Sequence, residues 1–302
     1  VTHIRGLIEG CGANPSLEPL SDWDVSNVTN MGGLFGSATE LSSLHGLEKW
    51  DVSKVTTLGG AFATCQHLTA LTPLADWDVS SLENMELMFN GSAITSLEPL
   101  SKWNTANVEK MNSIFANCGS LEKVTLAEVQ TIGDRSFAGC TSLTEVVIPA
   151  TVTTIGNEAF KDCPSLAKVI IENNTAISSL GDYSFYGVFL EAKGATVNLS
   201  NVETLGHASF MWAVIKSNSL TTLTKVTEIP DQAFYANSMS TLTLPNNILS
   251  IGEEAFCYCH SLTSVNIGNG VASIGESAFK LCGSLTSIVM GDSVTTIGHS
   301  AF

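Results

Sequence analysis

The sequence of 302 residues is poor in charged side chains, and most of those it has are acidic. Asp, Glu, Lys and Arg make up 14% of the chain, against about 25% in an average soluble domain. Only 13 residues are Lys or Arg, 29 are Asp or Glu, and the formal net charge is −16. Nucleic acids and anionic membrane surfaces attract clustered Lys and Arg. This composition therefore argues against both as partners.

Long apolar runs and the short motifs of common enzyme classes are also missing from the sequence. No apolar run approaches the roughly 18 residues that a membrane-spanning helix needs. The nucleophile-elbow, phosphate-loop and zinc-protease motifs do not occur, and the six His are scattered. We therefore predict that the protein is not an enzyme, has no cofactor and does not insert this segment into a membrane. Because the sequence lacks an initial Met and stops at Phe302 in mid-repeat, we expect a mature fragment.

What the sequence does contain is one phrase of twelve residues, found four times in its first 111 residues. LSDWDVSNVTNM at 20–31 returns as LEKWDVSKVTTL, LADWDVSSLENM and LSKWNTANVEKM, at spacings of 27, 27 and 26. Such self-similarity at a fixed period is the signature of a repeat architecture. A Phe closes each phrase, and Phe recurs at spacings of 22 to 27 to the end of the chain. These anchors are Phe35, Phe62, Phe89, Phe115, Phe137, Phe160, Phe185, Phe210, Phe234, Phe256, Phe279 and Phe302.

Two sequence patterns share this register and predict the local structure. Up to about residue 118 each repeat follows the W-D-V-S-x-V-x-x-M phrase, and later repeats read as LTEVVIP followed by VTTIGNEAFKDC. The short β-branched L-x-x-V-x-I segment predicts a strand, in places closed by a Pro. The segment around each Phe, such as GNEAFKDC, predicts a short helical turn. Residues 181–225 break this pattern, so we expect the solenoid to be irregular there.

Cysteine and tryptophan recur at fixed places in the repeat. Ile8 takes the place of the Phe in the first repeat, and with it seven of the eight Cys lie three residues after an anchor. This spacing places them in one interior slot of stacked turns. An even count also allows a disulfide framework, but stacked side chains point in parallel, so we favour buried free thiols. The repeated Trp (Trp23, Trp50, Trp77, Trp103) suggests an aromatic ladder for sugars. Because these Trp continue the apolar spacing of the repeat, we favour an interior position.

Asp24, Asp51 and Asp78, followed by Asn104, would form an acidic row in stacked turns. Like charges at strand spacing repel, so something must compensate them. Calcium is one solution, because it prefers oxygen ligands. An Asx turn, in which each Asp accepts amides of its own turn, is the other. No copy adds a second carboxylate to the loop. We favour Asx turns and predict no metal site, with calcium at this row as the alternative.

The position after each anchor Phe changes character in four consecutive repeats. Elsewhere it carries residues such as Gly36, Ala63 and Lys161, but there it carries Tyr186, Met211, Tyr235 and Cys257. Trp212 and Tyr258 follow one place further on. Stacked turns would align these side chains into a stripe, and exposed aromatic and Met clusters are enriched at binding surfaces. The stripe predicts either a partner site or local packing under the irregular 181–225 segment.

The later repeats resemble the BspA-like leucine-rich repeats of bacterial and protist surface proteins, and the W-D-x-S-x-V-x-x-M phrase resembles the repeat of about 26 residues often found beside them. The resemblance implies an α/β repeat solenoid, a right-handed leucine-rich-repeat coil of about a dozen turns. Short strands would line its concave side, with short helical turns and loops elsewhere. It places surface-protein-type repeats at 1–118 and BspA-like repeats at 119–302 in one continuous solenoid. Its two ends would lack capping segments.

The resemblance also implies a secreted or cell-surface protein used for adhesion or scaffolding, and it supplies no catalytic residues. We expect recognition of a protein or glycan through an extended Ser/Thr-rich sheet face, by many weak polar contacts on a rigid surface. The alternative is a structural subunit that assembles end to end into a surface layer or filament, because open complementary ends can stack without closing. The outward strand residues expected to contact a partner are Glu122, Lys123, Thr125, Thr144, Glu145, Lys168, Thr263, Ser264 and Asn266.

Overall fold

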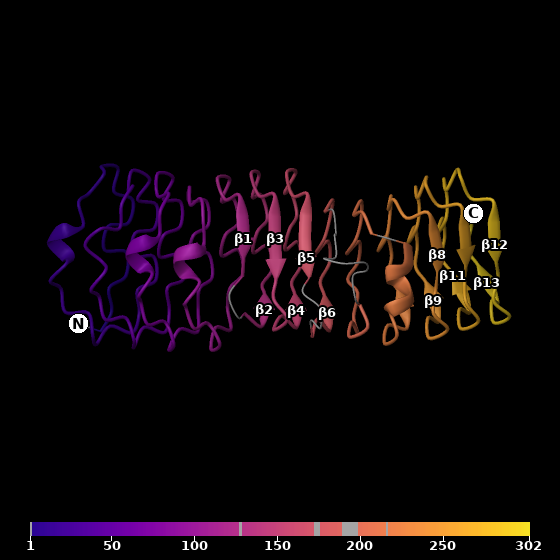
Figure 1. The fold of residues 1–302 in the computed structure, drawn as a ribbon, viewed down its shortest axis with the longest axis horizontal. Coiled ribbons are helices and arrows are strands. Elements are labelled where there is room, and N and C mark those ends of the chain that lie inside the picture. The colour runs from indigo at the N-terminus through magenta and orange to yellow at the C-terminus, as the bar shows by residue number, and fades with distance from the viewer. Residues whose placement is uncertain (1, 127–128, 172–175, 189–198, 216) are drawn as a thin grey trace. The chain divides into compact units, whose positions relative to one another are not determined.

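The computed structural model describes residues 2–126, 129–171, 176–188, 199–215 and 217–302, and Figure 1 shows its chain trace. Contacts divide the chain into two compact units. Unit 1 is Val1–Thr151 with Asp162–Leu166, and unit 2 is Val152–Lys161 with Ala167–Phe302. Part of the irregular segment 181–225, namely 189–198 and 216, lies outside the described residues.

Unit 1 is a coil of successive turns with few regular elements (Figure 1). Isolated parallel bridges join neighbouring turns in the order His3, Asn30, Thr57, Asn84 and Lys110. Strands begin only after these bridges, and β1 pairs with β3 in parallel. The elements are η1 (Glu18–Leu20), η2 (Thr72–Leu74), η3 (Glu98–Leu100), β1 (Lys123–Thr125), β2 (Thr131–Ile132) and β3 (Glu145–Ile148).

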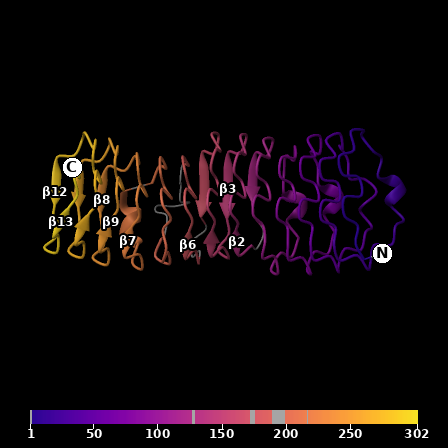
Figure 2. The same ribbon diagram turned by 180° about the vertical axis from the view of Figure 1, so that it is seen from behind.

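Unit 2 holds the remaining strands, and all its strand pairs are parallel in the part that the structure describes. One sheet has the order β12-β10-β8 and another β13-β11-β9-β7, so each turn adds one strand to each sheet (Figure 2). The first elements are β4 (Thr154–Ile155), β5 (Lys168–Ile171), β6 (Ser179–Leu180), η4 (Ser217–Thr222) and β7 (Glu228–Ile229). They are followed by β8 (Thr241–Thr243), β9 (Ser250–Ile251), β10 (Ser264–Asn266), β11 (Ser273–Ile274), β12 (Ser287–Val289) and β13 (Thr296–Ile297).

The described elements make a parallel β-solenoid with little helix, in which strands mark about seven turns. The strands do not confirm the expected dozen turns, because the described turns before β1 contain isolated bridges and no strands. The alternating burial of the short strands follows from the pleat, which points successive side chains to opposite faces. In β1, for example, Val124 is buried between exposed Lys123 and Thr125.

Anchor Phe side chains form the centre of the core in each unit. In unit 1 the rings from Phe35 to Phe137 stack turn on turn, with centroids 5.4–5.8 Å apart. In unit 2 the rings from Phe160 to Phe302 stack at 5.2–5.7 Å. Offset stacking of aromatic rings adds to the free energy gained by their burial. One large ring at a fixed place in each turn therefore holds the turns in register.

The segments around the Phe are chains of turns, and the expected helical turns are not confirmed there. Residues two before and two after the anchor are left-handed, as with Leu87 (φ 58°) and Gly91 (φ 68°) around Phe89. Left-handed residues interrupt a right-handed helix. Backbone hydrogen bonds instead alternate: Phe62 N–H donates to Met88 of the next turn, and Ala63 N–H donates within its own turn. This alternation ties each turn to its neighbour.

Candidate partner-binding surfaces

The repeated Trp side chains belong to the interior of unit 1. Trp50, Trp77 and Trp103 are buried, with exposed fractions of 4–5%. Each indole Nε1–H donates to a carbonyl oxygen of the preceding turn at 2.9 Å. The interior position is confirmed for these three, and a sugar-binding ladder is wrong for them. Trp23 is the exception, with 44% of its surface exposed.

Cysteines in the slot after the anchor are free thiols in the described structure, and all of those after Cys11 are buried. Each of these buried thiols donates to the carbonyl oxygen of a Phe in the preceding turn, at 3.0–3.3 Å. Burial raises the pKa of the Cys65 thiol to about 12 and that of Cys118 to about 11. These six Cys therefore link turns through hydrogen bonds, a role that the spacing alone did not reveal. The raised pKa values keep the Cys65 and Cys118 thiols protonated at neutral pH.

The acidic row consists of Asx turns. Oδ1 of Asp51 accepts hydrogen bonds from the Ser53 hydroxyl (2.6 Å) and the Ser53 N–H (3.1 Å), and Asp24 has the same partners in Ser26. Oδ1 of Asp78 accepts from the N–H of Ser80 at 3.0 Å. The hydrogen bonds from these Ser hydroxyls and amides hold the pKa of each Asp carboxyl below its usual value. Among the described residues, no group of three or more His, Cys, Asp or Glu is placed to hold a metal ion.

The aromatic stripe of unit 2 is exposed at Trp212 and Tyr258. Trp212 is 52% exposed and Tyr258 is 39% exposed. Both residues have left-handed backbone angles and lie two residues after their anchor Phe. Ser37 and Leu281, at the same position of other repeats, are exposed too. Tyr186, Met211 and Tyr235 are half-buried, whereas Cys257 is buried. The described part of the 181–225 segment thus leaves Trp212 and Tyr258 accessible to solvent.

Ring contacts join four residues of the stripe into two pairs, and a backbone hydrogen bond links the pairs. The rings of Tyr186 and Trp212 are 5.2 Å apart, and those of Tyr235 and Tyr258 are 5.3 Å apart. Trp212 N–H donates to the carbonyl of Tyr235 at 2.8 Å, which places the two pairs on adjacent turns. We call the surface formed by these four residues with Met211, Tyr183, His207 and His260 the aromatic cluster.

Three members of the aromatic cluster were missed by the sequence patterns. Tyr183 contacts the ring of Tyr186 and also that of His207, whose Nε2 lies 3.1 Å from the Tyr183 hydroxyl. The ring of His260 meets the ring of Tyr258 edge-on at 5.7 Å. Tyr183 and His207 precede their anchor Phe in the chain. The turns around the Phe, which contain left-handed residues, bring Tyr183 beside Tyr186, which follows the Phe. The available signal was their position shortly before an anchor Phe, two residues before it for Tyr183 and three for His207.

Six of the nine residues predicted to face outward lie on strands, whereas Glu122, Thr144 and Thr263 each lie one residue before a strand. On β1 and β3 of unit 1, Lys123 and Glu145 are aligned in register, and on β10 of unit 2 Asn266 lies beside buried Val265. Six of the nine are exposed and Glu145, Lys168 and Ser264 are half-buried. The structure does not bring the nine together into one site. The exposed ones are Glu122, Lys123, Thr125, Thr144, Thr263 and Asn266.

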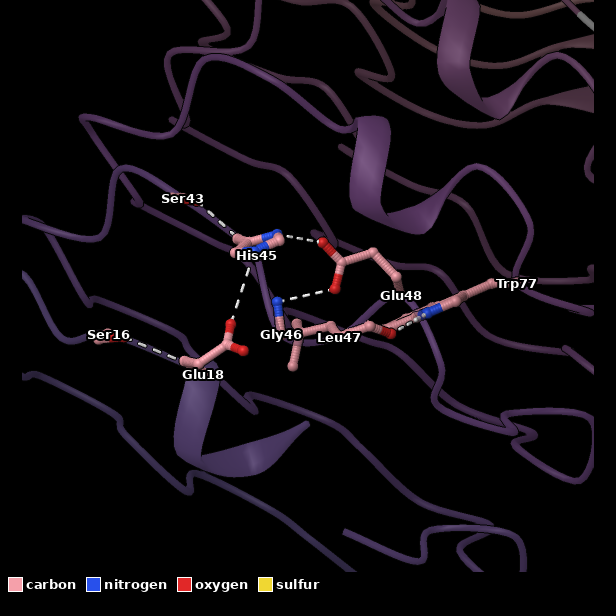
Figure 3. Close-up of polar contacts among 8 residues, drawn as sticks. All are labelled: Ser16, Glu18, Ser43, His45, Gly46, Leu47, Glu48 and Trp77. Atoms are coloured by element: carbon pink, nitrogen blue, oxygen red, sulfur yellow. Dashed lines mark hydrogen bonds and ion pairs between the residues drawn. The ribbon is translucent and has the colours of Figure 1, made fainter. Parts of the chain in front are cut away.

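His45 lies between two carboxylates of unit 1 and is shown in Figure 3. Its Nδ1 contacts Glu48, and its Nε2 lies 3.5 Å from Oε2 of Glu18 in the preceding turn. Oε2 of Glu48 also accepts from Gly46 N–H at 2.8 Å. Gly46 has φ 110°, and a Cβ there would lie 2.5 Å from the Leu17 carbonyl oxygen, so only Gly fits. His45 is 75% exposed, and exposed pairs of this kind contribute little stability. We assign it a role in joining turns.

A polar hollow of about 980 Å³ opens on unit 1, along the bridges that join its turns. We call it the polar trough. Asn30, Thr57 and Asn84 line it at equivalent places in successive turns, with Arg5 and Lys110 among the charged residues. No short motif marks the trough in the sequence, because its lining residues are spread over the chain at the repeat spacing.

Comparison with known proteins identifies the class of this solenoid. A model of the BspA type leucine rich repeat region matches residues 109–210 and 178–302, in 6 copies. A model described as Mycoplasma protein of unknown function, DUF285, matches residues 2–128. The chain belongs to the BspA-type leucine-rich-repeat family, which confirms the resemblance noted in the sequence. Families of this kind are repeat proteins that are typically not enzymes.

A solved structure with a TM-score above 0.5 shows the same fold. A leucine-rich repeat protein from Bacteroides ovatus is 22% identical, with a TM-score of 0.53, and the match covers 99% of this chain and 78% of that one. A leucine-rich repeat protein from Eubacterium ventriosum is also 22% identical, with a TM-score of 0.49 and coverages of 92% and 80%. No curated protein matches the chain. In the described residues, no helix has the length and apolar character to cross a membrane.

Proposed function

We propose that this protein is a non-enzymatic recognition protein of the cell surface or extracellular space, which binds a protein partner through the aromatic cluster of unit 2. The observation that carries the proposal is the exposure of Trp212 and Tyr258 on a solenoid whose other repeated aromatic residues, apart from Trp23 and Phe302, are largely interior. Tyr and Trp are enriched among the residues that contribute most to binding. Family membership supports a surface location, and leucine-rich-repeat proteins generally bind proteins.

The arrangement of the aromatic cluster suits a protein partner. Rigid rings supply large contact areas at a small cost in conformational entropy. Here ring contacts between neighbours, at 5.2 and 5.3 Å, further limit their freedom before binding. Half-buried Met211 lies among them and offers an adaptable apolar contact. The outward strand residues, such as Thr263 and Asn266, would add weak polar contacts around this centre, as a polar rim does in other interfaces.

The proposed function is tested by binding to a panel of immobilised matrix proteins, such as collagen and laminin. The wild type is compared with a triple variant, Tyr186→Ser, Trp212→Ser and Tyr258→Ser. Leu249→Ser is the matched control, because Leu249 is an apolar residue of unit 2 that is 54% exposed. We expect the triple variant to lose at least about tenfold in affinity, or 1.4 kcal/mol. The proposal would be refuted if the triple variant bound as tightly as the wild type, or if no protein of the panel retained the wild type.

We also propose that the repeat runs through 1–118 and 119–302 at one register, as about a dozen turns. The stacked Phe rings and the paired left-handed residues, which recur at successive anchors in both units, support this number. Adhesion, secretion and end-to-end assembly into a filament stay predictions. In an end-to-end assembly, another copy would cover apolar residues exposed on the last strands, such as Val289 and Ile297. Electron microscopy tests this prediction, because assembly yields fibres.

A further inference from the structure

The polar trough of unit 1 is a second candidate surface, distinct from the aromatic cluster. Its lining comes from five successive turns, and a further hollow of about 450 Å³ shares Thr56, Glu83 and Glu109 with it. Gly32, Gly33 and Gly59 form part of its floor. A Cβ built on Gly33 meets no other heavy atom within 4 Å, so the space above this residue is open.

The backbone of the trough floor is already hydrogen-bonded between turns. Gly33 N–H donates to Gly59 and Met31 N–H donates to Thr57, at 2.9 and 3.0 Å. Leu58 N–H likewise donates to Asn84 at 2.9 Å. An extended peptide that adds a strand needs unpaired backbone groups at a sheet edge. Recognition in the trough must therefore come from side chains.

Side chains of the trough present amide donors at a spacing of whole turns. Oδ1 of Asn30 accepts from Gly32 N–H at 3.0 Å, and Oδ1 of Asn84 accepts from Glu86 N–H at 2.8 Å. These bonds fix both carboxamides, and their Nδ2 groups have no partner in the part of the chain that the structure describes. Thr57 holds the equivalent place between them, with its Oγ1 accepting from Gly59 N–H at 3.2 Å. Neighbouring turns of a parallel sheet are about 4.8 Å apart.

Charged side chains of both signs line the same surface. Glu9, Glu83 and Glu109 provide carboxylate acceptors, and Arg5 and Lys110 provide donors. None of these five makes an ion pair within the described residues. Three carboxylates, on a chain of net charge −16, disfavour an anionic ligand, and the two cations disfavour a basic peptide. No aromatic or large aliphatic side chain lines the trough to anchor a hydrophobic peptide.

We propose that the polar trough binds a neutral, unbranched glycan, which lies across the turns with about one sugar unit per turn. A sugar hydroxyl both donates and accepts, so it matches amide donors and carboxylate acceptors that lie side by side. A pyranose unit in an extended chain has about the length of one strand spacing. This inference goes beyond the proposed function, because it concerns another unit and another class of ligand.

Gly33→Leu fills the trough and provides the test. Leu is tolerated in this conformation, since Leu87 holds the equivalent place before Phe89 with φ 58° against 64° for Gly33. Gly60→Leu is the matched control: Gly60 also has φ 64°, and a Cβ there also meets nothing within 4 Å. Gly60 does not line the trough. A second variant, Glu83→Ala with Glu109→Ala, changes only exposed side chains.

Titration calorimetry with neutral hexasaccharides of glucose, mannose and N-acetylglucosamine measures the binding, and circular dichroism checks that each variant is folded. We expect at least one hexasaccharide to bind, and both the Gly33→Leu and the double Glu variant to weaken it by at least about tenfold. Gly60→Leu and the aromatic triple variant should bind as the wild type does. The proposal is overturned if no neutral hexasaccharide binds, if hexagalacturonate binds more tightly, or if the trough variants bind normally. If only the aromatic triple variant lost hexasaccharide binding, the glycan site would lie in unit 2 instead.

Discussion

At the scale of single residues, the Asp of each N-terminal repeat is held by the Ser two places further on. The hydroxyl and the N–H of Ser53 both donate to Oδ1 of Asp51, and this lowers the pKa of the carboxyl. A carboxyl whose pKa is lowered by folding stabilises the folded state above its unfolded pKa of about 3.9. That contribution is lost as the pH falls through the lower, folded pKa.

Ser53→Ala should therefore raise the pKa of Asp51 toward its ordinary value of 3.8, because the largest stabilising hydrogen bond is removed. A pH titration followed by NMR of the side-chain carboxyl measures both proteins. Asp24, whose own Ser26 is unchanged, is the internal control. An Asp51 pKa that is the same in variant and wild type would contradict the Asx-turn account.

Calcium is the alternative explanation of the same row, and chelation tests it. Because Oδ1 of Asp24 and of Asp51 is occupied by Ser donors, we expect EDTA to leave the thermal unfolding midpoint unchanged. Addition of calcium should likewise have no effect. A midpoint that falls on chelation and recovers with calcium would show that the row holds a metal ion.

The thiols make a second prediction at the residue scale. Cys65 and Cys118 are buried, donate to Phe carbonyls and have pKa values of about 12 and 11. The thiolate is the reactive form of Cys, so both should resist alkylation by iodoacetamide at pH 8. Cys11 is half-buried and should be labelled first. Mass spectrometry of the native and the denatured protein reads each site, and rapid native labelling of Cys65 would contradict the structure.

At the scale of the element, three of the four repeated Trp, namely Trp50, Trp77 and Trp103, connect their turn to the preceding one by a hydrogen bond. The Trp77 Nε1–H donates to the Leu47 carbonyl, where both groups are away from water (Figure 3). Trp77→Phe leaves that carbonyl without its donor. The free energy of unfolding should fall by about 1–3 kcal/mol, which is the usual cost of an unsatisfied buried polar group.

Urea denaturation compares Trp77→Phe with Trp23→Phe, the same substitution at a Trp that is 44% exposed. The change at Trp23 should stay within about 0.5 kcal/mol, as is usual for exposed positions. Equal losses at the two sites would mean that the hydrogen bond to the preceding turn contributes nothing.

The interior of each turn was predictable because its residues repeat. Phe, Trp and Cys recur at fixed positions of the repeat, and in stacked turns each of these positions has one location in the core. The conformation around the Phe was not predictable, because ordinary residues such as Leu87, Arg135 and Ala208 take left-handed backbone angles there. Tertiary hydrogen bonds to the next turn override local preference at these positions. The segment around each Phe, such as GNEAFKDC, therefore predicted a helical turn where the chain forms a series of non-helical turns.

The candidate sites were predictable only in part, for a related reason. The stripe of Tyr186, Trp212 and Tyr258 departs from the repeat, and a departure is visible in the sequence. Tyr183 and His207 join it through backbone turns that the sequence pattern does not specify. The polar trough was missed altogether, because Asn30 and Asn84 resemble ordinary turn residues until the stacking of turns places them in one hollow.

At the scale of the whole molecule, the chain combines a repeated interior with outer residues that vary from turn to turn. Its two units present different chemistry: a polar trough with charges of both signs in unit 1, and an aromatic cluster in unit 2. Few surface charges and a net charge of −16 reduce attraction to polyanions. Partner choice then depends on these two local surfaces, which separate variants can test.

Hydroxyl-radical footprinting of the protein, alone and bound to the matrix protein that retains it, tests the central claim most directly. Trp212 and Tyr258 are accessible in the free protein, and the account predicts that their oxidation falls strongly in the complex. Leu249, 54% exposed in the same unit, should be oxidised equally in both. Unchanged oxidation of Trp212 and Tyr258, with protection elsewhere on the solenoid, would contradict recognition through the aromatic cluster.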